Sequence, residues 1–183
     1  MNLENTFIED LVIITPITHD DSRGFFFEGY SQAKYNNSGI KYQFIQDNQS
    51  FSKRGVIRGL HLQINPFAQA KLVRVLEGEI LDVVVDLRKN SPTYGQHLSV
   101  VLSAANKKQI VVPHGFAHGF SVLSESASVL YKVDQLYHKE SERGIRFDDP
   151  TLAIDWQLNL DEVIVSEKDL ALPSFNKIDW SFE

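Results

Sequence analysis

The chain contains no cysteine among its 183 residues. Disulfide bonds, thiolate nucleophiles and zinc sites built on sulfur are therefore excluded. Basic residues are also in the minority, since 18 Lys and Arg stand against 24 Asp and Glu and give a net charge of -6. A general nucleic-acid-binding protein needs a basic face, so this balance argues against that class.

Long apolar runs are missing as well, because no run approaches the roughly 20 residues of a membrane span. The segment Met1–Asn5 lacks the basic start and the apolar block of a signal peptide. Internal repeats, low-complexity tracts and Pro/Gly-rich linkers are absent too. We therefore expect a single domain over residues 1–183 that works in the cytoplasm and does not bind membranes.

Short segments rich in Val, Ile, Leu and Phe recur between turn signals and predict β-strands. The predicted strands are Leu11–Pro16, Gly24–Tyr30, Tyr42–Ser50, Val56–Gln63, Ala70–Glu77, Glu79–Leu87, His97–Leu102, Gln109–Val112, Gly119–Leu123 and Ser128–Asp134. Helix is scarce, with short helices predicted only at Ser31–Asn37 and at Ser166–Leu170, the second capped by Ser166. Many short strands joined by tight turns indicate an antiparallel sandwich or barrel.

A histidine, His61, stands inside the strand-like segment Val56–Gln63. An unperturbed imidazole titrates at about 6.5, so it can take up and return a proton in one turnover. Lys71 follows in the next predicted strand, and a lysine can stabilise an oxyanion that forms as a proton leaves. Such a histidine is also typical of a core or edge strand without a catalytic role.

Alternation along these strands predicts which side chains share a face. In the predicted strand Val56–Gln63, His61 and Gln63 share one face, and strict alternation turns Arg58 to the opposite face. A bulge at Gly59 would bring Arg58 round to the side of His61. In Ala70–Glu77 both faces are partly apolar, as expected of a sandwich whose outer face is also covered.

Six histidines raise the question of a metal site. They are His19, His61, His97, His114, His118 and His138. Small jelly-roll metalloenzymes usually need two histidines one residue apart on a strand, with a carboxylate and a later histidine. Gln63 occupies the second position after His61 and is a poor ligand. His114 and His118 are four apart, but Pro113 argues against a helix that would align them. We therefore predict no metal.

Further polar residues can carry chemistry, although each also occurs as an ordinary turn, core or surface residue. His118 follows a Pro-Gly turn at the mouth of a strand. Arg23 and Glu28 flank three phenylalanines, and a guanidinium beside aromatic rings can hold a diphosphate. Tyr131 can act as a general acid opposite a histidine base. Asp169 can fix the tautomer of a histidine and stabilise its cation.

These residues belong to a set of motifs that occur in a fixed order. The motifs are Arg23-Gly24-Phe25-Phe26-Phe27-Glu28, Gln46-Asp47-Asn48, Arg58-Gly59-Leu60-His61-Leu62-Gln63, Lys71-Leu72-Val73-Arg74, Pro113-His114-Gly115-Phe116-Ala117-His118-Gly119-Phe120, Tyr131-Lys132 and Lys168-Asp169. Each motif alone is weak, but together they make the chain closely similar to the dTDP-4-dehydrorhamnose 3,5-epimerase family, from about Phe7 to Pro173.

The resemblance implies a mainly β, cupin-like antiparallel jelly roll with a few short peripheral helices. It implies a homodimeric isomerase of dTDP-L-rhamnose biosynthesis that needs no cofactor and acts on a dTDP-sugar. It implies His61 as the base, Asp169 as its partner, Lys71 as the stabiliser of an enolate and Tyr131 as the proton donor. The substrate contacts implied by motif position are Arg23, Glu28, Gln46, Asp47, Asn48, Arg58, Lys71, His118, Glu142 and Lys168.

The implied reaction is chemically coherent. In a 4-keto sugar the ketone acidifies the protons on carbons 3 and 5, so a base can remove either one and leave an enolate. An acid on the other face then returns a proton and inverts the carbon, without metal or redox chemistry. Three alternatives remain at this point: an epimerase of carbon 3 or carbon 5 alone acting on a related dTDP-4-keto-6-deoxy sugar, a metal-dependent jelly-roll oxygenase, and a non-catalytic module that binds nucleotide sugars.

Overall fold

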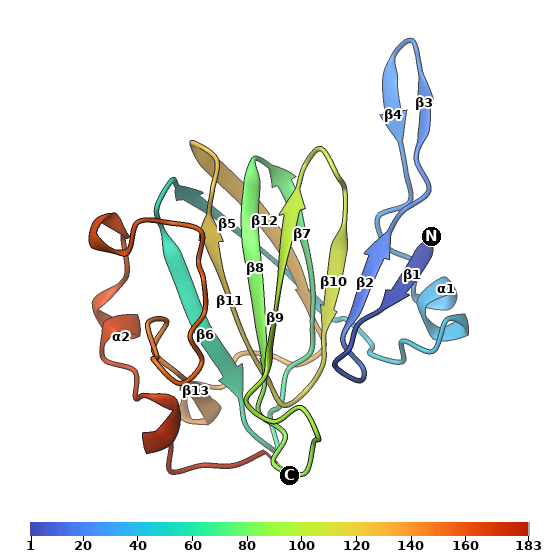
Figure 1. Ribbon diagram of the computed structural model, residues 1–183. Coiled ribbons are helices and arrows are strands. Elements are labelled where there is room, and N and C mark those ends of the chain that lie inside the picture. Colours follow the sequence, from blue (N-terminus) through green and yellow to red (C-terminus); the bar gives the residue numbers. More distant parts are fainter. Residues whose placement is uncertain (183) are drawn as a thin grey trace.

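Two antiparallel β-sheets packed face to face form the body of the molecule in the computed structural model, which describes residues 1–182 (Figure 1). The six-stranded sheet has the order β1-β2-β10-β7-β12-β5, and the five-stranded sheet has the order β13-β6-β11-β8-β9. All neighbouring strands within these sheets run antiparallel. The prediction of a mainly β, antiparallel jelly roll is thereby confirmed.

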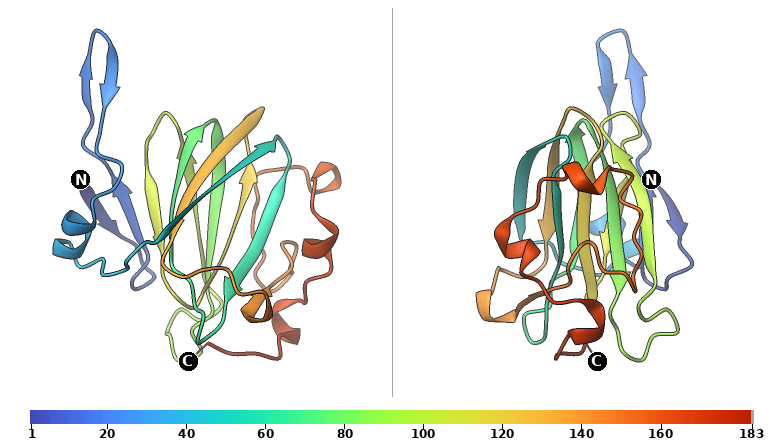
Figure 2. Two further views of the ribbon diagram at one scale, coloured as in Figure 1. Left: turned by 180° about the vertical axis from the view of Figure 1, so that it is seen from behind. Right: turned by 60° about the vertical axis from the view of Figure 1, so that its left-hand side comes forward.

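The strands of the six-stranded sheet are β1 (Asn2–Asn5), β2 (Val12–Thr15), β10 (Gln109–Val112), β7 (Lys71–Glu77), β12 (Ser126–Val133) and β5 (Gln46–Lys53). Those of the five-stranded sheet are β13 (Glu142–Gly144), β6 (Ile57–Gln63), β11 (Phe116–Val122), β8 (Glu79–Asp86) and β9 (His97–Ser103). Two further strands, β3 (His19–Asp21) and β4 (Gly24–Phe26), form a separate hairpin that extends beyond both sheets (Figures 1 and 2).

The helices are short. They are α1 (Gln32–Asn37), α2 (Glu167–Leu170) and the single 3-10 turns η1 (Lys139–Ser141), η2 (Leu160–Glu162) and η3 (Phe175–Lys177). As predicted, Ser166 caps α2, because its hydroxyl accepts a hydrogen bond of 3.1 Å from the backbone N–H of Asp169. Within residues 1–182, no helix has the length and the apolar character needed to cross a membrane.

Strand boundaries differ from the sequence prediction where pairing partners decide them. The predicted strand Gly24–Tyr30 ends at Phe26, because it pairs only with the three residues of β3. The predicted strand Tyr42–Ser50 is displaced to β5, which pairs with β12 along its whole length. The sequence does not predict β1 or β13, since both are short and polar and join their sheets through the backbone.

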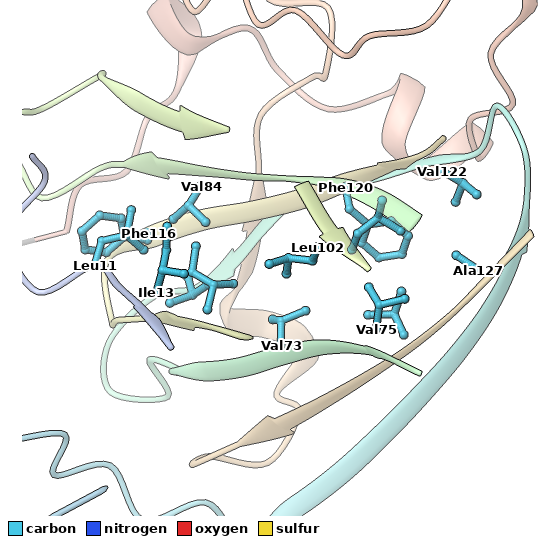
Figure 3. Close-up of a cluster of buried hydrophobic side chains, with 14 of the residues drawn as sticks. Leu11, Ile13, Val73, Val75, Val84, Leu102, Phe116, Phe120, Val122 and Ala127 are labelled. Carbon is cyan, nitrogen blue, oxygen red and sulfur yellow. The ribbon is translucent and has the colours of Figure 1, made fainter. Parts of the chain in front are cut away.

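The main core lies between the two sheets and consists of side chains from both (Figure 3). Val73 and Val75 come from β7, Val84 from β8, and Phe116 and Phe120 from β11, each no more than 6% exposed. Burial of one such side chain stabilises the fold by roughly 1.5–3 kcal/mol. Phe120 also borders the pocket described below, so this core forms the apolar end of that pocket.

Both outer faces of the sandwich are covered as well. The C-terminal segment lies along the five-stranded sheet (Figure 2), where Trp156 is 1% exposed and packs in one cluster with Leu81. The outer face of the six-stranded sheet is covered by Tyr35 and Ile40, which pack with Leu72 of β7. Covered faces explain why β8 is mostly apolar and buried on both sides, and they confirm the predicted two-sided burial of β7.

Candidate active site

A pocket of about 390 Å³ opens between the two sheets. Its walls come from β6 and β11 of one sheet, from β5, β7 and β12 of the other, and from β13 and α2. Eight of the predicted site residues line it: Arg58, His61, Lys71, His118, Tyr131, Glu142, Lys168 and Asp169. The structure therefore gathers into one place residues that lie more than 100 positions apart in the chain.

A bulge in β6 places Arg58 and His61 on the same side of the sheet. His118 of β11 pairs with His61 and Phe120 pairs with Arg58, so two residues of β6 stand opposite Gly119 alone. Gly59 has a φ of +120°, and a Cβ atom there would lie 2.6 Å from the Cα of Gly119. Only glycine suits this backbone and this close approach. The bulge considered from the sequence is confirmed, and strict alternation fails at this point.

His61 and Asp169 form a hydrogen-bonded pair. Nε2 of His61 lies 2.8 Å from Oδ1 of Asp169, and Oδ2 of the same carboxylate accepts a hydrogen bond of 3.2 Å from the N–H of Gly59. Burial works to raise the pKa of Asp169, but the hydrogen bonds from His61, Gly59 and Ser166 outweigh it and lower that pKa. An ionised carboxylate only accepts, so Nε2 of His61 carries the proton and Nδ1 the free lone pair.

A second histidine–carboxylate pair lies beside the first. His118 stands directly opposite His61 on β11, and its Nε2 lies 2.8 Å from Oδ2 of the fully buried Asp82. The sequence places His118 at the mouth of its strand, whereas in the structure it is buried in the middle of β11. No hydrogen-bond partner for Oδ1 of Asp82 is present among residues 1–182.

Lys71 enters the pocket from the six-stranded sheet. Its Nζ donates a hydrogen bond of 3.4 Å to the backbone carbonyl of His61, which brings the ammonium group beside the His61 pair. Burial lowers the pKa of Lys71 to about 8, although the carboxylates of Asp82 and Glu142 favour the charged form. At neutral pH the side chain is therefore mostly cationic and can stabilise negative charge that develops nearby.

Tyr131 faces the pocket from the wall opposite His61. It lies on β12 of the six-stranded sheet, next to Val73 of β7, whereas His61 lies on the five-stranded sheet. Burial raises the pKa of the Tyr131 phenol above its ordinary value of 10, with Arg58 acting in the opposite direction. The phenol therefore keeps its proton at neutral pH, and it stands across one cavity from the imidazole of His61, an arrangement that suits an acid and a base.

The side chains of the motif Gln46-Asp47-Asn48 on β5 point to both faces of that strand. Asn48 pairs directly with Tyr131 and shares its face, and Gln46 donates a hydrogen bond of 2.8 Å to the Asn48 side chain. Ser50, further along the same face, lines the pocket. Asp47 alternates to the other face, where it accepts a hydrogen bond of 2.7 Å from Lys132. Only two of these three predicted contacts thus share the face of the pocket.

Arg23 and Glu28 lie away from the pocket of their own chain. Arg23 sits in the β3–β4 hairpin with a side chain that is 88% exposed and, within residues 1–182, bonded only to Asp21. Glu28 follows the hairpin and forms an ion pair of 2.9 Å with Lys34 of α1. One chain by itself therefore does not bring these two predicted substrate contacts to the eight predicted site residues that line the pocket.

The rim of the pocket carries an aromatic ring and two charged groups. The hydroxyl of Tyr137 donates a hydrogen bond of 2.8 Å to Oε2 of Glu142, and Nζ of Lys168 donates one of 2.6 Å to the same atom. Burial works to raise the pKa of Glu142, but these two donors lower it, so the group is a carboxylate at neutral pH. Residues 1–182 contain no group of three or more His, Cys, Asp or Glu side chains placed to hold a metal ion.

Comparison with known proteins identifies the family. The family model described as dTDP-4-dehydrorhamnose 3,5-epimerase matches residues 5–177. The chain belongs to this family. Among its curated members, the dTDP-4-dehydrorhamnose 3,5-epimerase of Pseudomonas aeruginosa is 50% identical to this chain over 173 residues, which make up 94% of each protein.

Solved structures of epimerases support the same family assignment. The dTDP-4-dehydrorhamnose 3,5-epimerase from Elizabethkingia anophelis superimposes with a TM-score of 0.94 at 49% identity and covers 98% of this chain and 99% of its own. A dTDP-6-deoxy-D-glucose-3,5-epimerase from Legionella pneumophila, solved in complex with dTDP-4-keto-L-rhamnose, gives 0.93 at 50% identity, with 97% and 94% covered. The resemblance inferred from the motifs is thereby confirmed.

In this member of the dTDP-4-dehydrorhamnose 3,5-epimerase family, the sequence does not predict a site role for Asp82, which lies behind the pocket and holds His118, or for Tyr137, which lines the pocket. Asp82 interrupts the apolar run Ile80–Val85, and an acidic residue inside a buried strand needs a buried partner, which is the signal that points to it. Tyr137 carries no comparable signal, because only the fold shows that its loop reaches the rim.

Proposed function

We propose that this protein, as a cytoplasmic homodimer, converts dTDP-4-dehydro-6-deoxy-D-glucose into dTDP-4-dehydro-L-rhamnose by inverting carbons 3 and 5. The observation that carries this proposal is the His61–Asp169 pair facing Tyr131 across one pocket, in a chain of the 3,5-epimerase family. Curated relatives named for the 3,5-epimerase reaction are about half identical to this chain, which favours it over inversion of a single centre.

The first step is removal of a proton from the carbon beside the ketone. Nδ1 of His61 takes this proton, because Nε2 is held as a donor by the carboxylate of Asp169. The resulting imidazolium is stabilised by the same carboxylate. The electron pair of the broken C–H bond moves onto the keto oxygen, and the cationic Lys71 stabilises the enolate that forms.

The second step returns a proton to the opposite face. The Tyr131 phenol lies on the wall across from His61 and delivers its proton to the enolate carbon, which inverts that carbon and restores the ketone. The tyrosinate regains a proton from solvent, and His61 releases the one that it took. A second round at the other acidified carbon gives the doubly inverted sugar.

The charge of the pocket suits a nucleoside diphosphate. Arg58 and Lys168 bring cationic side chains to its walls in a chain whose net charge is -6. A local positive site in an otherwise acidic protein attracts an anionic substrate to one place. Gln46 and Asn48 add amide groups on the same face of the sheet as Tyr131, where they can form hydrogen bonds to a base or sugar.

A homodimer accounts for the placement of Arg23. The hairpin that carries it extends beyond both sheets (Figure 1). Its Phe25 and Phe26 are 59% and 70% exposed. Exposed aromatic rings on a projecting hairpin are suited to contact with another protein surface. We therefore place Arg23 and Glu28 in the pocket of a second copy of the chain.

Mixing two inactive variants tests this arrangement. Arg23→Ala and His61→Asn are co-expressed with different affinity tags, so that mixed dimers can be purified through both tags. If Arg23 acts in the partner's pocket, mixed dimers hold one intact site, and about half of the parent activity returns. Mixed dimers as inactive as either variant would show that Arg23 serves its own chain.

Deuterium incorporation tests the reaction itself. The protein is incubated with dTDP-4-dehydro-6-deoxy-D-glucose in deuterium oxide, and the product is analysed by NMR. Deuterium at both carbon 3 and carbon 5 with inversion of both is the expected result. Deuterium and inversion at one carbon alone would identify a mono-epimerase, and substrate that binds without any exchange would identify a non-catalytic binding module.

A further inference from the structure

Gln63 ends the strand that carries His61, and its side chain is 4% exposed with every part of its amide in use. Nε2 donates hydrogen bonds of 2.7 Å to the backbone carbonyl of Phe67 and of 3.1 Å to that of Leu136. Oε1 accepts one of 2.7 Å from the backbone N–H of His138. Although Gln63 borders the pocket, its amide forms hydrogen bonds with backbone groups of the protein instead of pointing into the pocket.

The three partners of Gln63 belong to two loops that pack against each other. The Phe67 and His138 rings stack with their centroids 3.8 Å apart and their planes 9° from parallel. Gln69 donates a hydrogen bond of 2.6 Å to the carbonyl of Gln135, and Nδ1 of His138 lies 3.0 Å from the Ser141 hydroxyl. The amide of Gln63 therefore sits at the centre of one assembly made by both loops.

This assembly holds Tyr137 at the rim of the pocket. The backbone groups that Gln63 binds, the carbonyl of Leu136 and the N–H of His138, flank Tyr137 on both sides. The Tyr137 hydroxyl in turn donates to the carboxylate of Glu142, which also accepts from Lys168. The buried amide of Gln63 thus fixes the backbone on both sides of Tyr137. From this backbone the Tyr137 side chain reaches the Glu142 carboxylate, which also binds Lys168.

We infer that Gln63 is a positioning residue that acts through Tyr137, and that it sets substrate affinity at the pocket rim rather than the chemical step. The inference rests on the proposed function, because it concerns the same pocket. It also gives Gln63 a role of its own at a position where jelly-roll metalloenzymes carry a histidine ligand. Loss of the amide would leave three backbone groups without partners and free the loop around Tyr137.

Steady-state kinetics of Gln63→Met test the inference. Methionine matches glutamine in length but makes none of the three hydrogen bonds. We expect KM to rise about tenfold while kcat stays within about threefold of the parent value, because the loss falls on binding. Ser121→Ala is the matched control, since it removes one buried hydrogen bond, 2.8 Å to the Trp156 carbonyl, away from the pocket. It should lower thermal stability without changing KM.

Combining Gln63→Met with Tyr137→Ala distinguishes a role of Gln63 in positioning Tyr137 from a general loosening of the fold. If Gln63 acts through Tyr137, adding Gln63→Met to Tyr137→Ala raises KM much less than it does in the parent. Equal and independent effects, an unchanged KM, or a loss confined to kcat would each overturn the inference. If Gln63→Met does not fold, Gln63→Glu takes its place, because it keeps the acceptor for the N–H of His138. A parent protein that exchanges no deuterium refutes the proposed function instead.

Discussion

Nε2 of His61 and Oδ1 of Asp169 lie 2.8 Å apart although 108 positions separate the two residues in the chain. Asp169 reaches His61 because α2 begins at the cap formed by Ser166 and lies beside β6. The lowered pKa of Asp169 keeps its carboxylate ionised, so His61 is held in one tautomer with its other ring nitrogen free.

Replacement of His61 by asparagine removes the proposed base and should lower turnover by about 100- to 10,000-fold, the range typical of a general acid–base group. The fold should persist, which circular dichroism and thermal unfolding can verify. His97→Asn is a suitable control, since His97 lies on β9 outside the pocket. Near-parent activity in a folded His61→Asn protein would contradict the assignment.

Asp169→Asn should impair catalysis much more than substrate binding. Asparagine can still accept hydrogen bonds, but it carries no charge to stabilise the imidazolium that forms when His61 takes a proton. Calorimetric binding of the substrate and single-turnover rates separate the two effects. Weak binding combined with an intact rate for bound substrate would make Asp169 a binding residue.

Tyr131→Phe should separate proton removal from inversion. His61 still forms the enolate from its own wall, but no phenol delivers a proton to the opposite face. In deuterium oxide the variant should exchange substrate protons with retention and form little inverted product, as seen by NMR. A uniform drop in exchange and inversion would indicate a packing role, and inversion at the parent rate would assign the donor to another group.

Turnover should fall as the pH rises through about 8, because the lowered pKa of Lys71 means that its cation is lost there. Below that pH the ammonium group is present and stabilises the enolate. Tyr131, with its pKa above 10, stays protonated over this range. In Lys71→Met the residual activity should be low and should lack this alkaline decline between about pH 7 and 9. The same decline in both proteins would assign it to a different group.

Chelator treatment should leave activity unchanged, because the proposed steps use only a base, an acid and a lysine cation. Dialysis against EDTA followed by the standard assay gives the measurement, with the untreated protein assayed in parallel. Activity that disappears with EDTA and returns with one added divalent metal would contradict the metal-free mechanism.

The sequence by itself determines the local features of this protein. Short segments rich in Val, Ile, Leu and Phe between turn signals predict antiparallel strands, because such side chains suit a buried, pleated surface. Ser166 caps α2 because a hydroxyl before a short helix satisfies its first N–H groups. Likewise, the turn at Gly78 has a φ of +78°, a conformation that glycine adopts readily. The motifs also point to the family, since their joint order is specific even though each is weak alone.

Only the tertiary structure decides which of these residues meet. Arg58 joins His61 because β6 bulges opposite Gly119; Gly59 permits this bulge, but only the pairing of β6 with β11 decides that it forms. Asp82 becomes the partner of His118 through the pairing of β8 with β11. Contacts of this kind arise when segments distant in the chain are brought into register, so local sequence patterns do not contain them.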